Sequence, residues 1–322
     1  MISLVESGDF IYDYLLAVSG GAMKDLLITP LFHDVKGHLK SHVDEIRKST
    51  MVHLHAPADV SGLLGLAMLE AAFLDIGIQY RRRFLPAQHH IPRDERIEPE
   101  LPKDGLLIFI DPFEDTWKVD ELPSHDYLHI TPLSVSVRIG SNQKERRGAL
   151  DVVAQCAALS AALSPNGSKT RLLRPFASTG LWLREALDTT FDPVHTTLRD
   201  ILRDEGAFRM VPLPEVASPA QGMIPGLSER MLKRLQKGWG TMDADSRASA
   251  LSELVLPALQ SPALSTPRLE ELVWHRLVVG ESDIDVMSQV FLVENSWPKD
   301  EKEAKIHASK LADILLKSGV LH

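Results

Sequence analysis

The chain has 322 residues, and its composition excludes several classes of protein. Apolar residues make up 44% and charged residues 25% of it, which is ordinary for a globular protein and supplies a sizeable core. The formal net charge of −9 argues against autonomous binding of nucleic acid, because neutralising phosphate groups needs a surplus of Lys and Arg. No apolar run approaches the roughly 20 residues of a membrane span, so we expect no membrane association. The length favours about two domains.

Two short segments bear on location and redox chemistry. The N-terminus, MISLVESGDF, carries no basic segment before an apolar one, which predicts a mature, cytoplasmic protein. The only cysteine, Cys156, excludes an internal disulfide. It lies in the apolar run VVAQCAALSAAL, which favours a buried structural thiol over a reactive one.

Residues 1–49 predict a helical lead-in. Apolar residues recur at helical spacing over residues 10–18 and again over residues 35–46. In the second stretch His38 and His42 lie four residues apart, which is a spacing that can hold a metal ion. Because no third ligand is in view, we favour a solvated helix face there.

The next stretch predicts a strand, a helix and a second strand. A strand over residues 51–54 is followed by a turn in which Asp59 can cap a helix. Helical spacing begins at Gly62 and ends at Gly77, a residue type that commonly terminates helices, and a second strand follows over residues 78–84. Ligands bind at the carboxyl ends of strands in open α/β sheets, so we expect a site in the loop that contains Asp59.

A polar, proline-rich loop is expected over residues 86–103. Together with the end of the preceding strand, it contains the most basic part of the sequence. The arginines that could contact nucleic acid or an acidic partner are Arg81, Arg82, Arg83, Arg93 and Arg96. Acidic residues are interspersed among them and weaken the local potential, so a solvated loop is favoured over such a contact.

The apolar run GLLIFI over residues 105–110 predicts a strand buried on both faces, and Asp111 follows it directly. An acid at this place is a common metal ligand and an equally common loop cap, and the residues alone do not decide between the two. Further strands are expected over residues 127–130, 135–139 and 172–178. Helices are expected over residues 148–163 and 182–205.

Two proline-rich stretches bound a helical connector over residues 213–267. Within it, short helices are expected over residues 227–236 and 246–259. The connector would separate residues 50–212, which contain the predicted sheet, from the end of the chain.

The last part, residues 268–322, contains two strand-like runs and a helix. The runs cover residues 272–279 and 286–293, and the helix covers residues 301–317. At about 55 residues this part is too small for a generous core of its own. We therefore expect it to pack on the rest of the chain or on a partner.

The order of these elements resembles the archaeal RecJ-like group of the DHH phosphoesterase superfamily. The segments that carry the resemblance are GDFIYDYLL, HLHAPADVSG, GIQYRRRF, LLIFIDPFED, GALDVVAQCAALSAAL, IPGLSERMLKRL and AKIHASKLADILLKSGVL. This group includes the nuclease associated with the GINS replication complex, and it is related to the eukaryotic helicase cofactor named cell division cycle forty-five. The resemblance implies an α/β fold, with a DHH-type domain whose mainly parallel sheet is flanked by helices over residues 50–212. It also implies a truncated α+β part over residues 268–322.

The resemblance also marks the positions of the metal ligands in active members. Those members have a His-x-Asp-Ala-Asp-Gly-type loop where this chain has HLHAPA, so His55 and Pro57 replace the two aspartates. The aspartate after the apolar strand is kept as Asp111, the Asp-His-His signature falls at Thr131 and the next two residues, and a later Gly-Asp has Leu181 in place of the acid. The remnants of this degenerate site are His53, His55, Pro57, Asp59, Asp111, Thr131 and Leu181.

With so few ligands left, we expect no catalytic residue and no metal ligand. A two-metal phosphoesterase needs several carboxylates and imidazoles around two cations roughly 4 Å apart. Asp111 with His53 and His55 does not meet that need. Mn or Mg, which prefer oxygen ligands, would bind only if the loop around Asp59 were rebuilt.

The resemblance therefore implies a non-catalytic scaffold subunit of an archaeal DNA replication assembly. Its implied partners are GINS and, through GINS, the MCM helicase, with weak or no autonomous DNA binding. One alternative is a regulatory pseudoenzyme that pairs with an active RecJ-like paralogue. Another is a residual metal-dependent exonuclease or phosphodiesterase that uses Asp111, His53 and Asp59.

Overall fold

The computed structural model describes residues 23–321, apart from 88–90, 93, 94, 97, 114, 141, 185, 186, 188–190, 260–263 and 281–283. The predicted helical stretch over residues 10–18 lies outside the described residues. The second stretch forms helix α2 (Lys36–Lys48), as predicted. None of the helices in the described part of the chain is long and apolar enough to cross a membrane.

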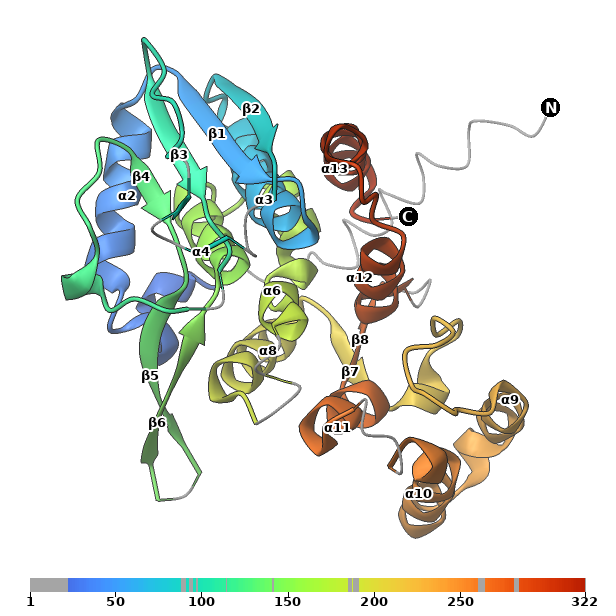
Figure 1. Cartoon of the computed structure of the whole chain (residues 1–322). Coiled ribbons are helices and arrows are strands. Elements are labelled where there is room, and N and C mark those ends of the chain that lie inside the picture. The colour runs from blue at the N-terminus through green and yellow to red at the C-terminus, as the bar shows by residue number, and fades with distance from the viewer. Residues whose placement is uncertain are drawn as a thin grey trace.

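Four parallel strands form the central sheet, in the order β2-β1-β3-β4 (Figure 1). They are β1 (Val52–Pro57), β2 (Tyr80–Leu85), β3 (Leu106–Ile110) and β4 (Leu128–Ile130). β2 pairs with one edge of β1, and the chain then crosses over so that β3 pairs with the other edge of β1. The strand order therefore reverses between β1 and β3, and the carboxyl ends of these two strands define a switch point of the kind at which α/β proteins bind ligands. The prediction of an α/β fold with a parallel sheet is confirmed.

Helix α3 (Val60–Ile76) links β1 to β2, and both of its predicted ends are confirmed. The Asp59 carboxylate accepts a hydrogen bond from the Gly62 backbone N–H at 2.7 Å, which caps the helix start. The helix ends at Gly77, whose φ of 76° is in the left-handed region that favours glycine. Most of α3 is buried, as its apolar sequence requires.

Helix α4 (Val152–Leu163) packs against α3 behind the sheet. The Ser160 hydroxyl donates to the Met68 carbonyl at 2.6 Å, which joins the two helices directly. Gly65 allows close approach, because a Cβ there would lie 3.4 Å from both Cys156 Sγ and Ile110. The Cys156 thiol is fully buried, as predicted.

An antiparallel hairpin, β5 (Leu133–Ile139) and β6 (Lys144–Leu150), projects from the sheet region (Figure 1). The sequence predicted a strand over 135–139 but placed residues 148–150 in a helix, and that assignment is wrong. These residues belong to β6, whose exposed, charged sequence lacks the apolar alternation that would mark it as a strand. The helix begins only after Asp151, which caps it.

Two further predictions for this half of the chain are corrected. The apolar run over 172–178 forms no strand, because it lies at the end of α5 (Ser168–Leu173) and in the turns that follow. The single helix predicted over 182–205 is interrupted at Arg184, whose backbone is extended where α6 (Thr179–Leu183) ends, and α8 (Pro193–Glu205) forms its later part. Asp192 caps α8 through the backbone N–H groups of residues 194 and 195 and so sets its start.

The connector and the following helix form a helical group at one end of the molecule (Figure 1). Its members are α9 (Glu229–Gly238), α10 (Ala244–Leu259) and α11 (Thr266–Trp274). The predicted strand over 272–279 is therefore only half correct, because its first residues end α11 and only β8 (Arg276–Val279) is extended. β8 pairs antiparallel with β7 (Arg209–Val211) and β9 (Ile284–Asp285).

The strand predicted over 286–293 is also wrong, because this run forms helix α12 (Val286–Asn295). Its Val-rich sequence favours extended structure, but the Asp285 carboxylate accepts from the Met287 N–H and starts a helix. Two buried ion pairs hold this region together, Arg276 with Asp285 and Arg199 of α8 with Glu271 of α11.

The final helix, α13 (Glu301–Ser318), packs on α3, α5 and β2, which confirms the expected docking of the end of the chain. Arg82 of β2 makes the polar link. Its guanidinium lies 3.2 Å from the buried Glu70 carboxylate of α3 and 2.5 Å from Asp313 of α13, and it also donates to the Ser309 carbonyl. Burial raises the pKa of Glu70 to about 7, although the charge of Arg82 opposes that rise.

Replacing Arg82 with Met should reduce the free energy of unfolding by about 3 kcal/mol, because it leaves the buried Glu70 carboxylate without its cation. Urea denaturation at pH 7.5 measures the loss. The exposed neighbour Arg81→Met is the control and should change stability by less than about 0.5 kcal/mol. Adding Glu70→Gln to Arg82→Met should restore most of the loss, and an unchanged loss in the double variant would contradict this explanation.

Candidate functional site

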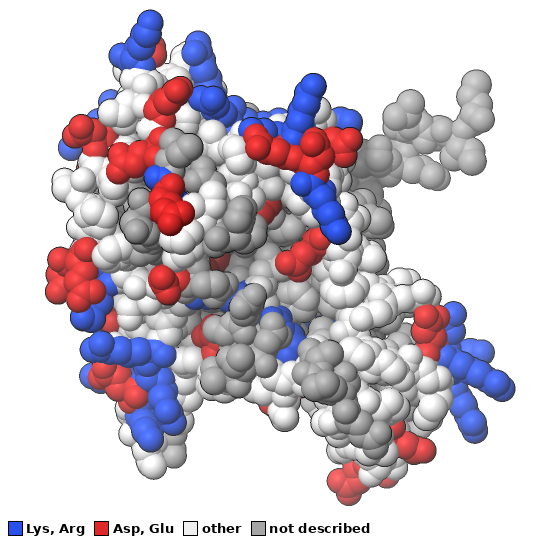
Figure 2. All heavy atoms as spheres, in the orientation of Figure 1, with Lys and Arg blue, Asp and Glu red and all other residues white. Residues whose placement is uncertain are grey.

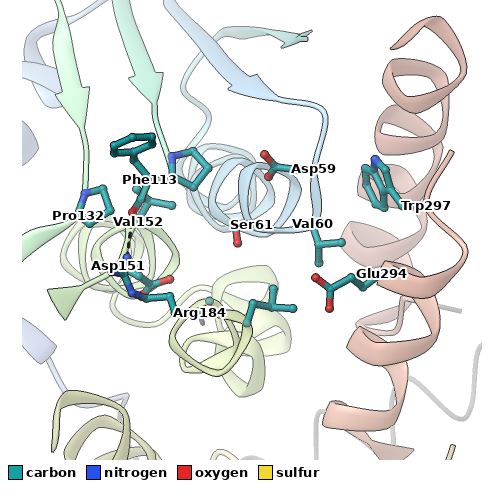
Figure 3. A pocket seen from close by; sticks show the side chains of 13 residues that line it. Asp59, Val60, Ser61, Phe113, Pro132, Asp151, Val152, Arg184, Glu294 and Trp297 are labelled. Carbon is teal, nitrogen blue, oxygen red and sulfur yellow. Dashed lines mark hydrogen bonds between the residues drawn. The ribbon is translucent and has the colours of Figure 1, made fainter. Parts of the chain in front are cut away.

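A cavity of about 520 Å3 lies at the switch point of the sheet (Figure 3). Its walls come from the β1–α3 loop, the end of β3, the starts of α4 and α6, and the end of α12. Side chains that define its chemistry are Asp59, Phe113, Asp151, Arg184, Glu294 and Trp297. A cavity therefore lies at the loop that contains Asp59, where the sequence led us to expect a site.

Two of the acidic side chains in this cavity start helices. Asp59 caps α3, and the Asp151 carboxylate accepts from the backbone N–H groups of Val153 at 3.2 Å and Ala154 at 3.1 Å. Burial raises the pKa of Asp151 to about 6, although these hydrogen bonds and the charge of Arg184 oppose the rise. Both carboxylates are thus committed to backbone donors, which reduces their capacity to bind a cation.

Gly180 has no side chain, and the Asp151 carboxylate occupies the space that a side chain would fill. A Cβ at this position would overlap the Asp151 carboxylate and contact Val153. Leu181, the residue next to Gly180 and one of the seven remnants, is fully buried in the apolar core. Gly180 therefore forms part of the pocket wall, while Leu181 lies behind it in the core.

Asp111, the retained aspartate of the predicted site, is paired with a cation from the same chain. Arg96 Nη1 lies 2.6 Å from Asp111 Oδ1, and His129 Nε2 lies 3.3 Å from Oδ2. Burial tends to raise the pKa of Asp111, but the hydrogen bond with His129 and the charge of Arg96 hold it below its ordinary value. The carboxylate is therefore ionised and already neutralised.

Arg96 also organises the loop that precedes β3. Its Nε donates to the Ile91 carbonyl at 3.1 Å, and its guanidinium lies 4.1 Å from the centre of the Phe113 ring. Such stacking is a favourable arrangement for a guanidinium. Arg96 is thus turned inward against Asp111 and Phe113 and does not lie on an exposed basic surface.

The other predicted arginines differ in their surroundings. Arg81 and Arg83 are exposed on the same face of β2, and Arg83 lies 3.9 Å from the Glu100 carboxylate. Arg82 is engaged with α3 and α13, and Arg93 lies outside the described residues. Of the described members of this group, Arg82 and Arg96 are therefore paired with buried carboxylates, while Arg81 and Arg83 face outward.

The histidines of β1 do not join Asp111. In the parallel register His53 is level with Leu107, four residues before Asp111, which corresponds to roughly 13 Å along the strand. His55 is level with Phe109 and is 7% exposed. Burial, followed by the charges of Arg83 and His53, lowers its pKa to about 4.

Pro57 and Thr131 contribute to local structure. Pro57 ends β1 against the first turn of α3, where a Cβ on Gly62 would overlap the Pro57 carbonyl. Thr131 is buried, and its carbonyl accepts a hydrogen bond from the Gln155 side chain at 2.8 Å. Neither residue joins Asp111 as a potential metal ligand.

Of the six side chains that define the cavity, the sequence indicated only Asp59, and the other five were missed. Asp151 precedes a helical run and was recognisable as a cap, but the predicted helix start at residue 148 concealed it. Arg184 donates to the Phe113 carbonyl at 2.9 Å, and Trp297 donates its indole N–H to the Ala58 carbonyl at 2.8 Å. Both reach the site from distant elements, so no local pattern marks them.

A second cavity, of about 430 Å3, lies at the β4 edge of the sheet beside α2. His38, His42, His125 and His129 line it. His42 is buried, which corrects the prediction of a solvated helix face, because this side of α2 covers the edge of the sheet. Across the described residues, no three His, Cys, Asp or Glu side chains form a group that could hold a metal ion.

No protein-family model matches this chain, and no curated protein matches it either.

The pH dependence of stability should depend on His42. Its pKa is lowered to about 3, first by burial and then by the neighbouring His38 and His129. Its contribution to stability is therefore complete above pH 6.5 and is lost as the pH falls from 6.5 towards 3. Between pH 6.5 and 5 the unmodified chain should lose roughly 2 kcal/mol more than His42→Leu. Urea denaturation at each pH measures this, with the exposed His33→Gln as the control. Parallel stability curves for the unmodified chain and His42→Leu would contradict the assignment.

Proposed function

We propose that this chain is a non-catalytic RecJ-like protein that serves as a structural subunit of an archaeal DNA replication assembly. Its first partner would be GINS, and GINS would link it to the MCM helicase. The observation that carries the non-catalytic part of this proposal is the ion pair between Arg96 and Asp111. The sequence resemblance supplies the choice of partner.

The chemistry of phosphoester hydrolysis explains why this ion pair matters. Two divalent cations normally neutralise the phosphate and generate a hydroxide, and acidic side chains hold them. Here the Arg96 guanidinium lies against Asp111, while backbone N–H groups engage Asp59 and Asp151. A divalent cation would have to displace these interactions one by one. The site therefore favours a stable frame over hydrolysis.

The charge of the chain supports a protein partner over nucleic acid. The net charge is −9, and the arginines near the sheet are divided between buried ion pairs and separate exposed positions. A continuous row of phosphate contacts would need these cations together on one surface.

We expect the full chain to co-elute with the cognate GINS subunits in size-exclusion chromatography at about 10 µM of each component. Arg96→Ala tests whether the loop that this residue fixes belongs to the interface. Separate elution of the chain and GINS at this concentration would contradict the proposed partner. If the chain instead binds an active RecJ-like paralogue and changes its nuclease rate, the regulatory alternative would replace the scaffold role.

We also expect no hydrolysis of single-stranded DNA, RNA or cyclic dinucleotides with about 1 mM Mn2+, because Asp111 is already neutralised by Arg96. Product analysis on denaturing gels and by liquid chromatography provides the measurement. The matched control is Asp111→Ala, which should give the same traces as the unmodified chain. Turnover that Asp111→Ala abolishes would restore the enzymatic alternative.

A further inference from the structure

Helix α9 presents an unusual concentration of positive charge. Arg230, Lys233, Arg234 and Lys237 recur at intervals of three and four residues, so they share one face of the helix, and all four are exposed. The opposite face buries Leu232 and Leu235. Figure 2 shows the Lys and Arg side chains gathered over α9 at the lower right of the molecule. In a chain of net charge −9, this stripe is a local reversal of charge.

An apolar groove of about 260 Å3 runs along the same helix. One wall is the segment over residues 217–224, and the other is formed by α9 residues including Leu232 and Lys233. Lys233 therefore belongs to both the groove and the basic stripe. The volume is below the roughly 300 to 1,000 Å3 of ordinary small-molecule pockets, so the groove has room for a single large side chain rather than a cofactor.

The floor of the groove is electrically balanced. Arg276 lines it, but its guanidinium is buried against the Asp285 carboxylate and also donates to the Ser288 hydroxyl at 2.8 Å. A side chain that enters the groove would therefore meet no unbalanced charge from Arg276. Charge recognition is left to the exposed stripe on α9.

From this combination we propose that α9 and the groove beside it bind an acidic peptide segment that carries one large apolar side chain. The apolar side chain would fill the groove, and the flanking Asp or Glu residues would lie over Arg230, Lys233, Arg234 and Lys237. This proposal rests on the proposed scaffold role, since it assigns a surface to a protein partner. The complementary charges would mainly raise the association rate and select the partner, while burial of the apolar side chain would slow its release.

Nucleic acid is a poorer match for this surface. Proteins that bind single strands stack the bases on aromatic side chains, and none of the residues that line the groove is aromatic.

The test uses a fluorescein-labelled peptide of about twelve residues with four glutamates around one central leucine, and the full chain. We expect saturable binding in fluorescence anisotropy, with a dissociation constant below about 100 µM at low salt. Lys233→Glu/Arg234→Glu should weaken binding at least about tenfold, because it reverses two charges of the stripe. Ala217→Trp, a substitution at an exposed position of the groove wall, should weaken it similarly by filling the groove.

Matched controls separate specific from general charge effects. Arg146→Glu/Arg147→Glu makes the same charge change on the exposed β5–β6 hairpin and should alter the affinity less than about twofold. Peptides with serine for leucine, or with glutamine for glutamate, should each bind at least about tenfold more weakly. Circular dichroism confirms that every variant is folded.

Three results would overturn the proposal. The first is the absence of saturable peptide binding at about 1 mM chain. The second is a loss of peptide affinity in Arg146→Glu/Arg147→Glu equal to that in Lys233→Glu/Arg234→Glu. The third is binding of an oligothymidine that is stronger than binding of the peptide and depends on the same α9 residues. If Lys233→Glu/Arg234→Glu no longer binds the peptide but still co-elutes with GINS, the α9 surface is not where GINS binds, and GINS remains the proposed partner. If the unmodified chain binds the peptide but does not co-elute with GINS, the α9 surface is supported as a peptide-binding site, and GINS is excluded as its partner.

Discussion

The ion pair between Arg96 and Asp111 determines what the carboxyl end of the sheet can do. Parallel strands bring their ends and the starts of the following helices to one edge, and an aspartate buried there must find a positive charge or take up a proton. Arg96 supplies that charge from a loop 15 residues earlier in the chain. The same side chain bonds the Ile91 carbonyl and stacks on Phe113, so the loop before β3 and the wall of the cavity are fixed by one guanidinium.

The other acidic groups of this edge satisfy the same requirement with backbone N–H groups. Asp59 and Asp151 each cap a helix, and Gly180 leaves the space that Asp151 needs. The outcome is an α/β frame in which the carboxylates of Asp59, Asp111 and Asp151 are all engaged by groups of the same chain. This engagement of the three carboxylates supports the proposed scaffold role, because a cation would have to compete with these contacts.

The fold was predictable where local chemistry sets the boundaries of an element. The β1–α3–β2 unit was predicted from Asp59 at the helix start and Gly77 at its end, and α13 from its amphipathic spacing. Prediction failed for short apolar runs, because helix and strand cannot be distinguished over seven or eight residues, as α12 shows. It also failed for β6, since an exposed strand rich in Lys and Arg has no apolar alternation.

The site was predictable only in part. Its location followed from the predicted strand, turn and helix around Asp59, which are local features. The partner of Asp111 could not be predicted, because the charge pattern of residues 81–96 indicates an exposed basic loop. It does not indicate which arginine turns inward. Trp297 reaches Ala58 across 239 residues, and the register that separates His53 from Asp111 emerges only when the strands are paired.

The most direct test of the central claim is a carboxyl carbon NMR titration of Asp111 in the unmodified chain and in Arg96→Gln. We expect a midpoint below the ordinary value of 3.8 in the unmodified chain, because His129 and Arg96 stabilise the carboxylate. In Arg96→Gln the midpoint should rise by at least about one pH unit, since burial then outweighs the remaining contact with His129. An Asp111 midpoint that is the same in both chains would contradict the claim that Arg96 supplies the charge at this site.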